Sequence, residues 1–538
     1  MRPPSGVLLL ASLLAIALLA AVALSYATPQ GLGLSDDSIA YIAGARSLLQ
    51  GRGYREIWLA SSQPVTHLPP GYPAALAFLG KVLGLDPLRG TRFLNLALLG
   101  SSTIAIGILG WWMTRLWTAG VVLAALFATN PSVIRLYADA LSEPLYIFLS
   151  LLSFLAFAQH LRDPDPDKGP GASQRGLQRL QPWVWLAACG ALVGAAYLTR
   201  YAGLALVLSF LLALPLLHRR WDRILSHAGA FLAGALPLIA AWSLRNRWLG
   251  GTATNRALGW HPITAENVEM AVYNVSTFLV PIESWRRALV RSGWLLDALL
   301  GVLAACFLVW LGRVVLAGLR GRRGAPAEPI ALLVGLYSAA YLGSVIVAMS
   351  FFDASTKFAL RILSPLFVSA LVLLVAAGAW LWRAGSQRLR LLVIVAGLST
   401  LAVSLYGSGD AVTVLHQGGQ GYASFKWYDS SAMAFLRDLP VETRIYTNEP
   451  AAVYLYTDRG CYVLPDRLDP VTREPRPGFE QGVADLRADV LSGDAVLALF
   501  DDRDLGPGEA EALTEGLSLV HKSAGDEIYA VPSLQVTR

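Results

Sequence analysis

The chain has 538 residues, of which 55% are hydrophobic and 15% charged, and its mean hydropathy is +0.51. A water-soluble enzyme of this length is not so apolar, so a membrane must solvate most of the chain. The net charge of +6 does not indicate nucleic acid as a partner, because the basic residues fall in short loops between apolar runs.

Eleven apolar runs of helical length follow one another along the chain. They cover residues 6–26, 93–113, 116–130, 144–160, 183–198, 202–217, 228–244, 293–317, 330–352, 362–382 and 391–406. The first run has about 20 apolar residues and no clear cleavage site, so we predict a retained helix and not a signal peptide. We therefore predict an all-α polytopic membrane domain over residues 1–406 with about 11 transmembrane helices.

Basic residues mark alternate loops between these runs, and the positive-inside rule makes those loops cytoplasmic. They are Arg2, Arg115, Arg162, Lys168, Arg175, Arg179, Arg219, Arg220, Arg223, Arg320, Arg322, Arg323, Arg383, Arg388 and Arg390. The N-terminus is then cytoplasmic, and the segments 27–92, 131–143, 199–201, 245–292 and 353–361 face outward with the tail. We also predict a polar, Pro/Gly-rich cytoplasmic linker over residues 163–171.

The first outward segment and the tail both predict additional structure. Residues 38–50 and 72–83 have helical apolar spacing, so we expect two helices along the outer membrane interface. In the tail, strand-like runs at 444–447, 495–500 and 527–531 alternate with helix-like segments such as 430–439. These predict a small extracytoplasmic α/β domain over residues 407–538, where 21 acidic residues stand against 11 basic ones.

Two adjacent acids, Asp36 and Asp37, begin the first interfacial helix, and Tyr41 follows at helical spacing. One interpretation is a helix cap, since an acid there accepts backbone N–H bonds and favours the positive end of the helix dipole. Two acids exceed what one cap needs, so chemistry is the alternative. Three cysteines far apart, Cys189, Cys306 and Cys461, indicate neither a disulfide framework nor a zinc site.

Two further outward motifs have ordinary structural interpretations. The sequence from His67 through Pro69-Pro70-Gly71 to Tyr72 marks a turn into the second interfacial helix. Ser142-Glu143-Pro144 is most simply a cap followed by a proline at the first helical position.

Four cations stand at outward helix ends, namely Arg200, Arg245, Lys357 and Arg361. Singly, each could snorkel to lipid head groups. A cation in a three-residue turn such as Thr199-Arg200-Tyr201 is costly and usually has a partner. Together the four predict an anion site facing the same compartment as Asp37.

This set of motifs resembles the polytopic GT-C glycosyltransferases, in particular the lipid A aminoarabinose transferases, the protein O-mannosyltransferases and the lipopolysaccharide galacturonic acid transferases. The resemblance rests on Asp37-Ser38-Ile39-Ala40-Tyr41, Pro69-Pro70-Gly71-Tyr72-Pro73, Ser142-Glu143-Pro144-Leu145, Leu198-Thr199-Arg200, Arg245-Asn246 and Arg361-Ile362-Leu363-Ser364-Pro365. It implies a GT-C fold and a sugar donor on a polyprenyl phosphate, with a lipid, glycan or protein acceptor at the extracytoplasmic face. The family often has Asp-Glu where this chain has Asp37-Ser38, and the aminoarabinose branch has a lysine near the position of His67.

Glycosyl transfer needs a base for the incoming hydroxyl and cations for the leaving phosphate. We predict Asp37 as the base with Asp36 as a second catalytic acid. We predict Arg200, Arg245, Arg361 and Lys357 for the donor phosphate, and Tyr41, His67, Tyr72 and Glu143 as substrate contacts. No cofactor is expected, and Asp36, Asp37 and Glu143 are weak evidence for a divalent cation.

Two other functions fit parts of the pattern. A transporter or flippase of lipid-linked substrates would use the same cations, but such proteins place binding groups near the midplane of repeated halves. No internal repeat is evident, and the ionisable residues gather at one face. A cell-envelope assembly protein that binds a partner through its tail is the third alternative.

Overall fold

The computed structural model describes residues 4–162, 176–253, 258–320, 328–353, 355–469, 474–501, 505, 508–523 and 525–532. The predicted linker at 163–171 and the basic residues Arg2, Lys168, Arg175, Arg322 and Arg323 lie outside this part of the chain. The chain forms two compact units, which we describe separately. The helical unit comprises Met1–Thr28, Thr66–Tyr72 and Phe93–His416, and the sheet unit comprises Pro29–Val65, Pro73–Arg92 and Gln417–Arg538.

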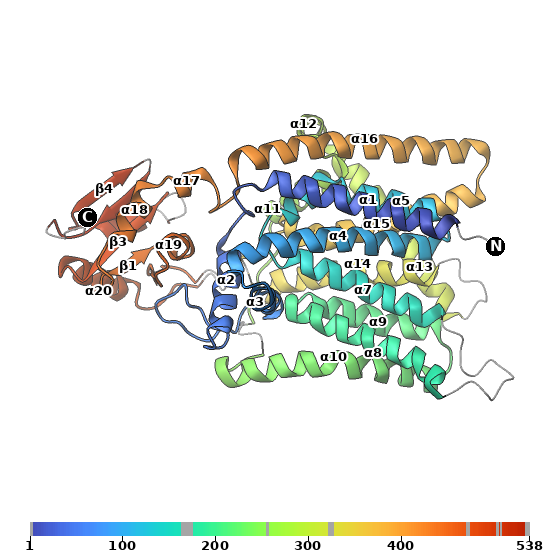
Figure 1. The fold of residues 1–538 in the computed structure, drawn as a ribbon, viewed down its shortest axis with the longest axis horizontal. Helices are drawn as coiled ribbons and strands as arrows, with labels where there is room; N and C mark the ends of the chain where they lie inside the picture. The colour runs from blue at the N-terminus through green and yellow to red at the C-terminus, as the bar shows by residue number, and fades with distance from the viewer. Residues whose placement is uncertain are drawn as a thin grey trace. The chain divides into compact units, whose positions relative to one another are not determined.

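Long helices make up the helical unit (Figure 1). They are α1 (Pro4–Ala27), α4 (Pro87–Thr114), α5 (Trp117–Ala128), α6 (Pro131–Tyr137), α7 (Glu143–Arg162), α8 (Gly176–Thr199), α9 (Gly203–Leu217), α10 (Trp221–Gly250), α11 (Ala265–Leu279), α12 (Glu283–Arg291), α13 (Trp294–Leu319), α14 (Pro329–Phe351), α15 (Leu360–Ala384) and α16 (Gln387–Gly418). Each of the eleven predicted apolar runs coincides with one of these helices. In the described part of the chain, eight helices are long and apolar enough to cross a membrane.

The predicted number of about 11 spans exceeds the number that helix length supports. The bent pair α5 and α6 would raise the eight spans to nine. The apolar part of α8, Trp183–Thr199, and helix α9 are shorter than the roughly 20 residues of a full span. Helix α9 still packs inside the unit, because the side chains along one of its sides are buried.

A sharp break separates α5 from α6, which meet at 63°. Pro131 has no N–H and therefore cannot continue the hydrogen bonding of α5. Asn130 caps the new helix, because its side chain accepts a bond of 2.9 Å from the Ser132 N–H.

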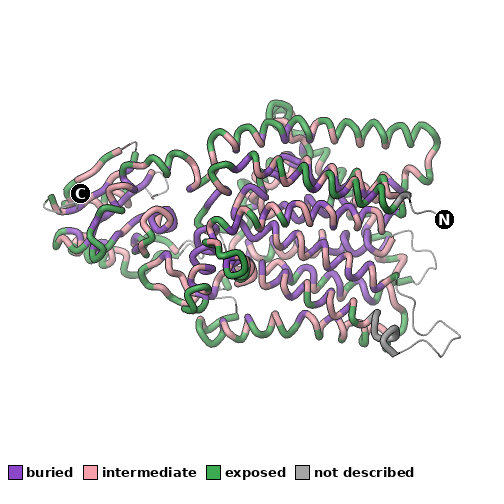
Figure 2. The backbone as a smooth tube through the Cα atoms, in the orientation of Figure 1, coloured by how far each residue is buried: buried purple, intermediate pink, exposed green. Residues whose placement is uncertain are grey.

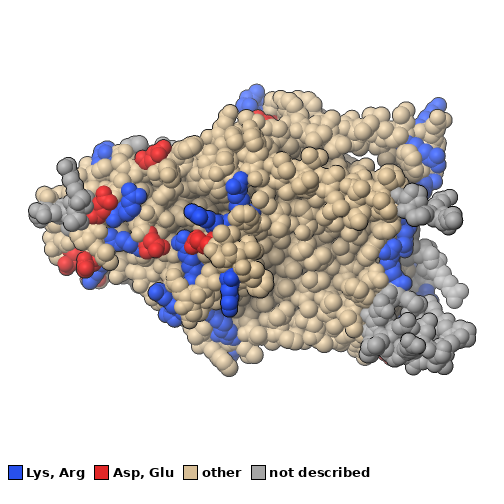
Figure 3. Space-filling view, viewed as in Figure 1, with Lys and Arg blue, Asp and Glu red and all other residues tan. Residues whose placement is uncertain are grey.

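The outer helices of this unit present apolar side chains to their surroundings. Leu18 and Leu19 of α1 are 67% and 68% exposed, and α16 is exposed along most of its length (Figure 2). The visible face has a broad band without charged side chains, and Lys and Arg gather at the end that holds the N-terminus (Figure 3). An apolar belt of this kind is what a lipid environment requires, so the chain is a multi-pass membrane protein.

Glycines bring α8 and α10 into backbone contact. A Cβ at Gly190 would overlap the Phe231 carbonyl of α10, and a Cβ at Gly234 would overlap the Ala187 carbonyl of α8. Small residues at such positions allow close helix approach in membranes. The two helices are linked through α9 and run in the same direction, so the ends that carry Arg200 and Arg245 lie together.

Several predicted cytoplasmic ends also lie together. Glu328 caps α14, accepting bonds of 3.0 and 3.1 Å from the N–H groups of Ile330 and Ala331. Burial raises the pKa of Glu328 to about 7, although its backbone bonds and the charges of Arg115 and Arg162 act in the opposite direction. The α4–α5 junction, the end of α7 and the start of α14 therefore share one electrostatic environment.

The sheet unit combines a mixed sheet with short helices. Its elements are α2 (Asp36–Leu49), α3 (Gly71–Leu83), α17 (Phe425–Tyr428), α18 (Ser431–Arg437), β1 (Arg444–Thr447), α19 (Pro450–Thr457), β2 (Tyr462–Val463), α20 (Phe479–Leu491), β3 (Ala495–Phe500), α21 (Glu509–Thr514), β4 (Leu519–Ser523) and β5 (Asp526–Tyr529). The strand order is β2-β1-β3-β5-β4, parallel among the first three and antiparallel from β3 onward. All six residues of β3 are buried, as expected of a central strand covered on both faces.

The predicted tail elements are confirmed, because the runs at 444–447 and 495–500 are β1 and β3, and the third run overlaps β5. The two helices predicted in the first outward segment appear as α2 and α3. Helix α16 continues past residue 407 to Gly418. The assignment of a membrane domain to 1–406 and an extracytoplasmic domain to 407–538 stays a prediction.

Candidate active site

The start of α2 lies in the sheet unit and holds the two predicted acids. Ser35 is the cap residue, and its N–H donates to Ser38 Oγ at 3.0 Å. Asp36 and Asp37 therefore occupy the first two helical positions and neither is the cap, although both are favoured there by the helix dipole. Asp36 is exposed and Asp37 is half-buried, whereas Tyr41 is 5% exposed.

Asp36 is engaged by the tail. The Tyr422 hydroxyl lies 2.7 Å from Asp36 Oδ1 and 2.5 Å from Glu449 Oε2. A phenol has one proton, so it donates to only one of the two carboxylates at a time. Burial and the charge of Asp36 raise the pKa of Tyr422, which keeps the phenol protonated. Asp36 is therefore tied to the tail through Tyr422.

Arg46, near the end of α2, serves a structural purpose. Its guanidinium makes two bonds to the Asp86 carboxylate, of 2.9 and 3.0 Å, and a third of 3.4 Å to the Tyr454 hydroxyl. Burial acts to lower the pKa of Arg46, but the bonds to Asp86 and Tyr454 outweigh it and the pKa is raised. A bidentate pair of this kind fixes α2 to the loop before α4.

A buried ion pair stands in the helical unit, where α7 begins and α8 ends. Arg200 Nη1 lies 2.6 Å from Glu143 Oε1 and donates to Ser142 Oγ at 3.2 Å. The Glu143 side chain is 1% exposed and the Arg200 side chain 21%. The sequence predicted that Arg200 needs a partner, and Glu143 is that partner.

Three buried tyrosines lie near the Glu143–Arg200 pair, and the sequence analysis did not identify them. The hydroxyls of Tyr146 and Tyr337 lie 3.0 Å apart, and the Tyr341 hydroxyl donates to the Ile362 carbonyl at 2.8 Å. Tyr341 also interacts electrostatically with both Glu143 and Arg200. Tyr146 follows Glu143 within one helical turn, a spacing that could have pointed to it.

A second network joins the predicted Arg245-Asn246 motif to the segment before His67. Asn246 is fully buried, and its Nδ2 donates to the Thr66 carbonyl at 2.9 Å. The Tyr201 hydroxyl donates to the same carbonyl at 3.3 Å and accepts a bond of 3.1 Å from Trp242 Nε1. The Arg245 guanidinium lies 4.7 Å from the centre of the Trp242 ring and donates to Asn246 Oδ1.

The segment from His67 to Tyr72 lies against the end of α8. A Cβ at Gly71 would stand 2.7 Å from the Leu198 carbonyl oxygen and 2.8 Å from Thr199 Oγ1, so only glycine fits without a shift. His67 is half-buried and Tyr72 is fully buried. The structure thus brings three motifs that are distant in sequence to one end of the helical unit.

Arg361 and Lys357 lie at and before the start of α15. Pro365 cannot donate to the Arg361 carbonyl, and Ser364 Oγ donates to it instead at 2.6 Å. Tyr341 connects this turn to the Glu143–Arg200 pair through the neighbouring Ile362 carbonyl. Lys357 is exposed, and Arg361 is half-buried.

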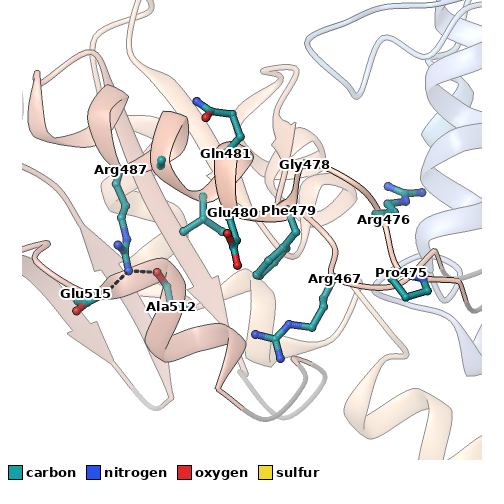
Figure 4. A pocket seen from close by; sticks show the side chains of 12 residues that line it. Arg467, Pro475, Arg476, Gly478, Phe479, Glu480, Gln481, Arg487, Ala512 and Glu515 are labelled. Carbon is teal, nitrogen blue, oxygen red and sulfur yellow. Dashed lines mark hydrogen bonds and ion pairs between the residues drawn. The ribbon is translucent and has the colours of Figure 1, made fainter.

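A hollow of about 890 Å³ opens in the sheet unit, away from every predicted site residue within that unit (Figure 4). Its arginines are largely engaged. Arg487 bonds Glu515 and the Ala512 carbonyl, and the Arg467 guanidinium lies 5.3 Å from the centre of the Phe479 ring. We therefore place the candidate site on the motifs and not on this hollow.

No protein-family profile matches the sequence, and no curated protein matches it. Among solved structures, the chain is similar to ArnT from Cupriavidus metallidurans in the apo state, with a TM-score of 0.56, 15% identity and 98% of each chain covered. The chain therefore shares the fold of ArnT. The structure of that ArnT bound to undecaprenyl phosphate matches with a TM-score of 0.51 and 16% identity, over 99% of this chain and 100% of the other.

The GT-C likeness extends to a second protein. The archaeal oligosaccharyltransferase AglB from Archaeoglobus fulgidus, in complex with an inhibitory peptide and a dolichol-phosphate, matches with a TM-score of 0.53 and 13% identity. That match covers 98% of this chain and 75% of AglB. The predicted likeness of fold is therefore confirmed, and the roles of individual side chains are matters for proposal.

Proposed function

We propose that this protein is a membrane glycosyltransferase that moves a sugar from a polyprenyl-phosphate donor to an extracytoplasmic acceptor. The observation that carries the proposal is the likeness to ArnT over 98% of both chains, which accounts for the helices and the sheet together. The form of ArnT bound to undecaprenyl phosphate supports a lipid phosphate as the donor's carrier. We propose a multi-pass cell-membrane protein with a cytoplasmic N-terminus.

The donor phosphate is held by Arg200, Arg245 and Arg361, assisted by Lys357. A guanidinium can serve a carboxylate and a phosphate together, because it has five N–H groups in a planar fork. The Glu143–Arg200 distance of 2.6 Å supports a revised role for Glu143, as the residue that positions Arg200. Tyr41, His67 and Tyr72 remain proposed substrate contacts. Of these, Tyr41 and Tyr72 are buried and shape the site from within.

Asp37 is the general base. It accepts the proton of the acceptor hydroxyl as that oxygen bonds to the anomeric carbon, while the bond from that carbon to the phosphate oxygen breaks. The polyprenyl phosphate leaves with the electron pair, and direct displacement inverts the anomeric centre. The spacing to Tyr41 supports Asp37 as the base, and the Tyr422 bond gives Asp36 an auxiliary role.

The test begins with binding. Purified protein in nanodiscs is titrated with undecaprenyl phosphate and followed by native mass spectrometry. We expect Arg245→Gln to weaken binding at least tenfold, whereas the matched control Arg287→Gln, an exposed arginine of α12, binds like the wild type. Binding that is equal in all three proteins would overturn the assignment of the phosphate site.

The second arm measures chemistry with a panel of polyprenyl-phosphate sugars. A transferase releases polyprenyl phosphate and forms a new glycosidic bond. A flippase, the alternative, moves the intact lipid across a sealed vesicle and breaks no bond. Transport without bond cleavage would contradict the proposed function.

A further inference from the structure

Three histidines from three helices meet in the helical unit. His160 ends α7 in its last turn, His218 directly follows α9, and His227 lies in the second turn of α10. Each histidine offers one ring nitrogen, and these three nitrogens lie within 4.8 Å of one another. His160 is 6% exposed, and the other two are half-buried.

The ring of His227 is oriented for coordination. Its Nδ1 lies 2.6 Å from the Arg223 carbonyl oxygen. A carbonyl only accepts, so Nδ1 carries the hydrogen and Nε2 keeps a lone pair. Metal-bound histidines commonly have their second nitrogen held in this way. The Trp183 ring of α8, 5.0 Å from the His227 ring, holds it from another side.

We propose that His160, His218 and His227 form a binding site for a divalent transition metal, with Zn²⁺ as its ion. Imidazole nitrogens suit Zn²⁺, whereas Mg²⁺ and Ca²⁺ take oxygen ligands. Three imidazoles leave the fourth tetrahedral position to water. Zn–N bonds place ligand nitrogens about 3.3 Å apart, so nitrogens that lie within 4.8 Å of one another need shifts of about 1 Å or less each.

This ion would fasten helix ends and not act in catalysis. It would join the ends of α7, α9 and α10. Glu143 and His160 stand at opposite ends of α7, roughly 26 Å apart at 1.5 Å per residue. The proposal is therefore independent of the transferase function and tested without it.

Metal content gives the first test. The protein is purified without a polyhistidine tag, stripped with chelator, dialysed against Zn²⁺ and measured by elemental mass spectrometry. We expect one Zn²⁺ per chain in the wild type and in the control His521→Ala, and near none in His227→Ala or His218→Ala. Added Zn²⁺ should raise the unfolding temperature of the first two proteins only. Equal metal content in all four proteins would overturn the proposal.

A second measurement needs no substitution and decides the matter if the variants fold poorly. Histidines of the folded wild type are modified with diethyl pyrocarbonate, with and without Zn²⁺, and located by peptide mass spectrometry. Zn²⁺ should protect His160, His218 and His227 at least fivefold and leave His521 unchanged. Protection of none of the three would also overturn the site.

Discussion

The acid at the start of α2 and the acid at the start of α7 stand at similar helix positions but in different environments. Asp37 is half-buried on a helix that Ser35 already caps. Glu143 is 1% exposed and depends on Arg200, 2.6 Å away. The comparison teaches that burial and the bond to Arg200 make Glu143 part of the packed structure, while Asp37 keeps a partly exposed side chain.

Breaking the buried pair should have the largest effect on stability. Glu143→Gln leaves the Arg200 charge without its carboxylate, so we expect a loss of about 3–5 kcal/mol in unfolding free energy. The double variant Glu143→Gln/Arg200→Gln should recover most of that loss, because no buried charge is left unpaired. Chemical denaturation in detergent measures all three proteins.

The same experiment sharpens the contrast with α2. Asp37→Asn should lower the unfolding free energy by less than Glu143→Gln does, because Asp37 is half-buried whereas the Glu143 side chain is 1% exposed. If the Asp37 variant is as destabilised as the Glu143 variant, the distinction between the two acids fails.

Glu328 extends the comparison to a half-buried acid that accepts hydrogen bonds from backbone N–H groups. Its pKa of about 7 in the folded chain exceeds its ordinary value of 4.5, so the folded chain binds an additional proton between these pH values. The stability it contributes is fully present below pH 4.5 and is lost as pH rises to 7. Glu328→Gln should therefore stabilise the protein at pH 8, by at most roughly 3 kcal/mol, and have no effect near pH 4.5.

Thermal unfolding at both pH values checks this expectation, with the exposed Glu283→Gln as the control. A Glu328 variant that is less stable than the wild type at pH 8 would show that its backbone bonds and Arg115 outweigh burial.

Asn246 makes a buried hydrogen bond between neutral groups, in contrast to the charged Glu143–Arg200 pair. Asn246→Ala removes the donor to the Thr66 carbonyl in a fully buried position, so we expect a loss of about 1–3 kcal/mol. Asn267→Ala on α11 is the matched control. If both variants unfold alike, the Asn246 network does not hold the His67 segment in place.

Tyr422→Phe should have a small effect on stability. It removes one phenol proton shared by Asp36 and Glu449 in a partly open position, which is worth about 1 kcal/mol. Activity should fall less than for a change at Asp37. Complete loss of turnover in this variant would mean that Asp36, and not Asp37, is the important acid.

The sequence predicted local elements well and their partners less well. Helical spacing located α2 and α3, and strand-like runs located β1 and β3, because these patterns are local. The pairing of Glu143 with Arg200 joins residues far apart in the chain, and no local pattern identifies it. The sequence predicts the end of a span at Pro131, where the structure has a bent pair of helices, because an apolar run does not reveal a change of direction.

The cluster of His160, His218 and His227 could likewise not be predicted from the sequence. His160 lies 58 residues before His218 and on another helix, so no metal-ligand spacing appears in the sequence. Only the packing of α7, α9 and α10 brings their rings together.

The most direct test of the account is the turnover of Asp37→Asn. With a donor that the wild type uses, we expect kcat to fall by about 10²–10⁴, the contribution of a general base, while donor KM and unfolding temperature stay unchanged. Asp429→Asn, an exposed acid of the sheet unit, should keep the wild-type rate. A folded Asp37→Asn protein with full kcat would contradict the central claim.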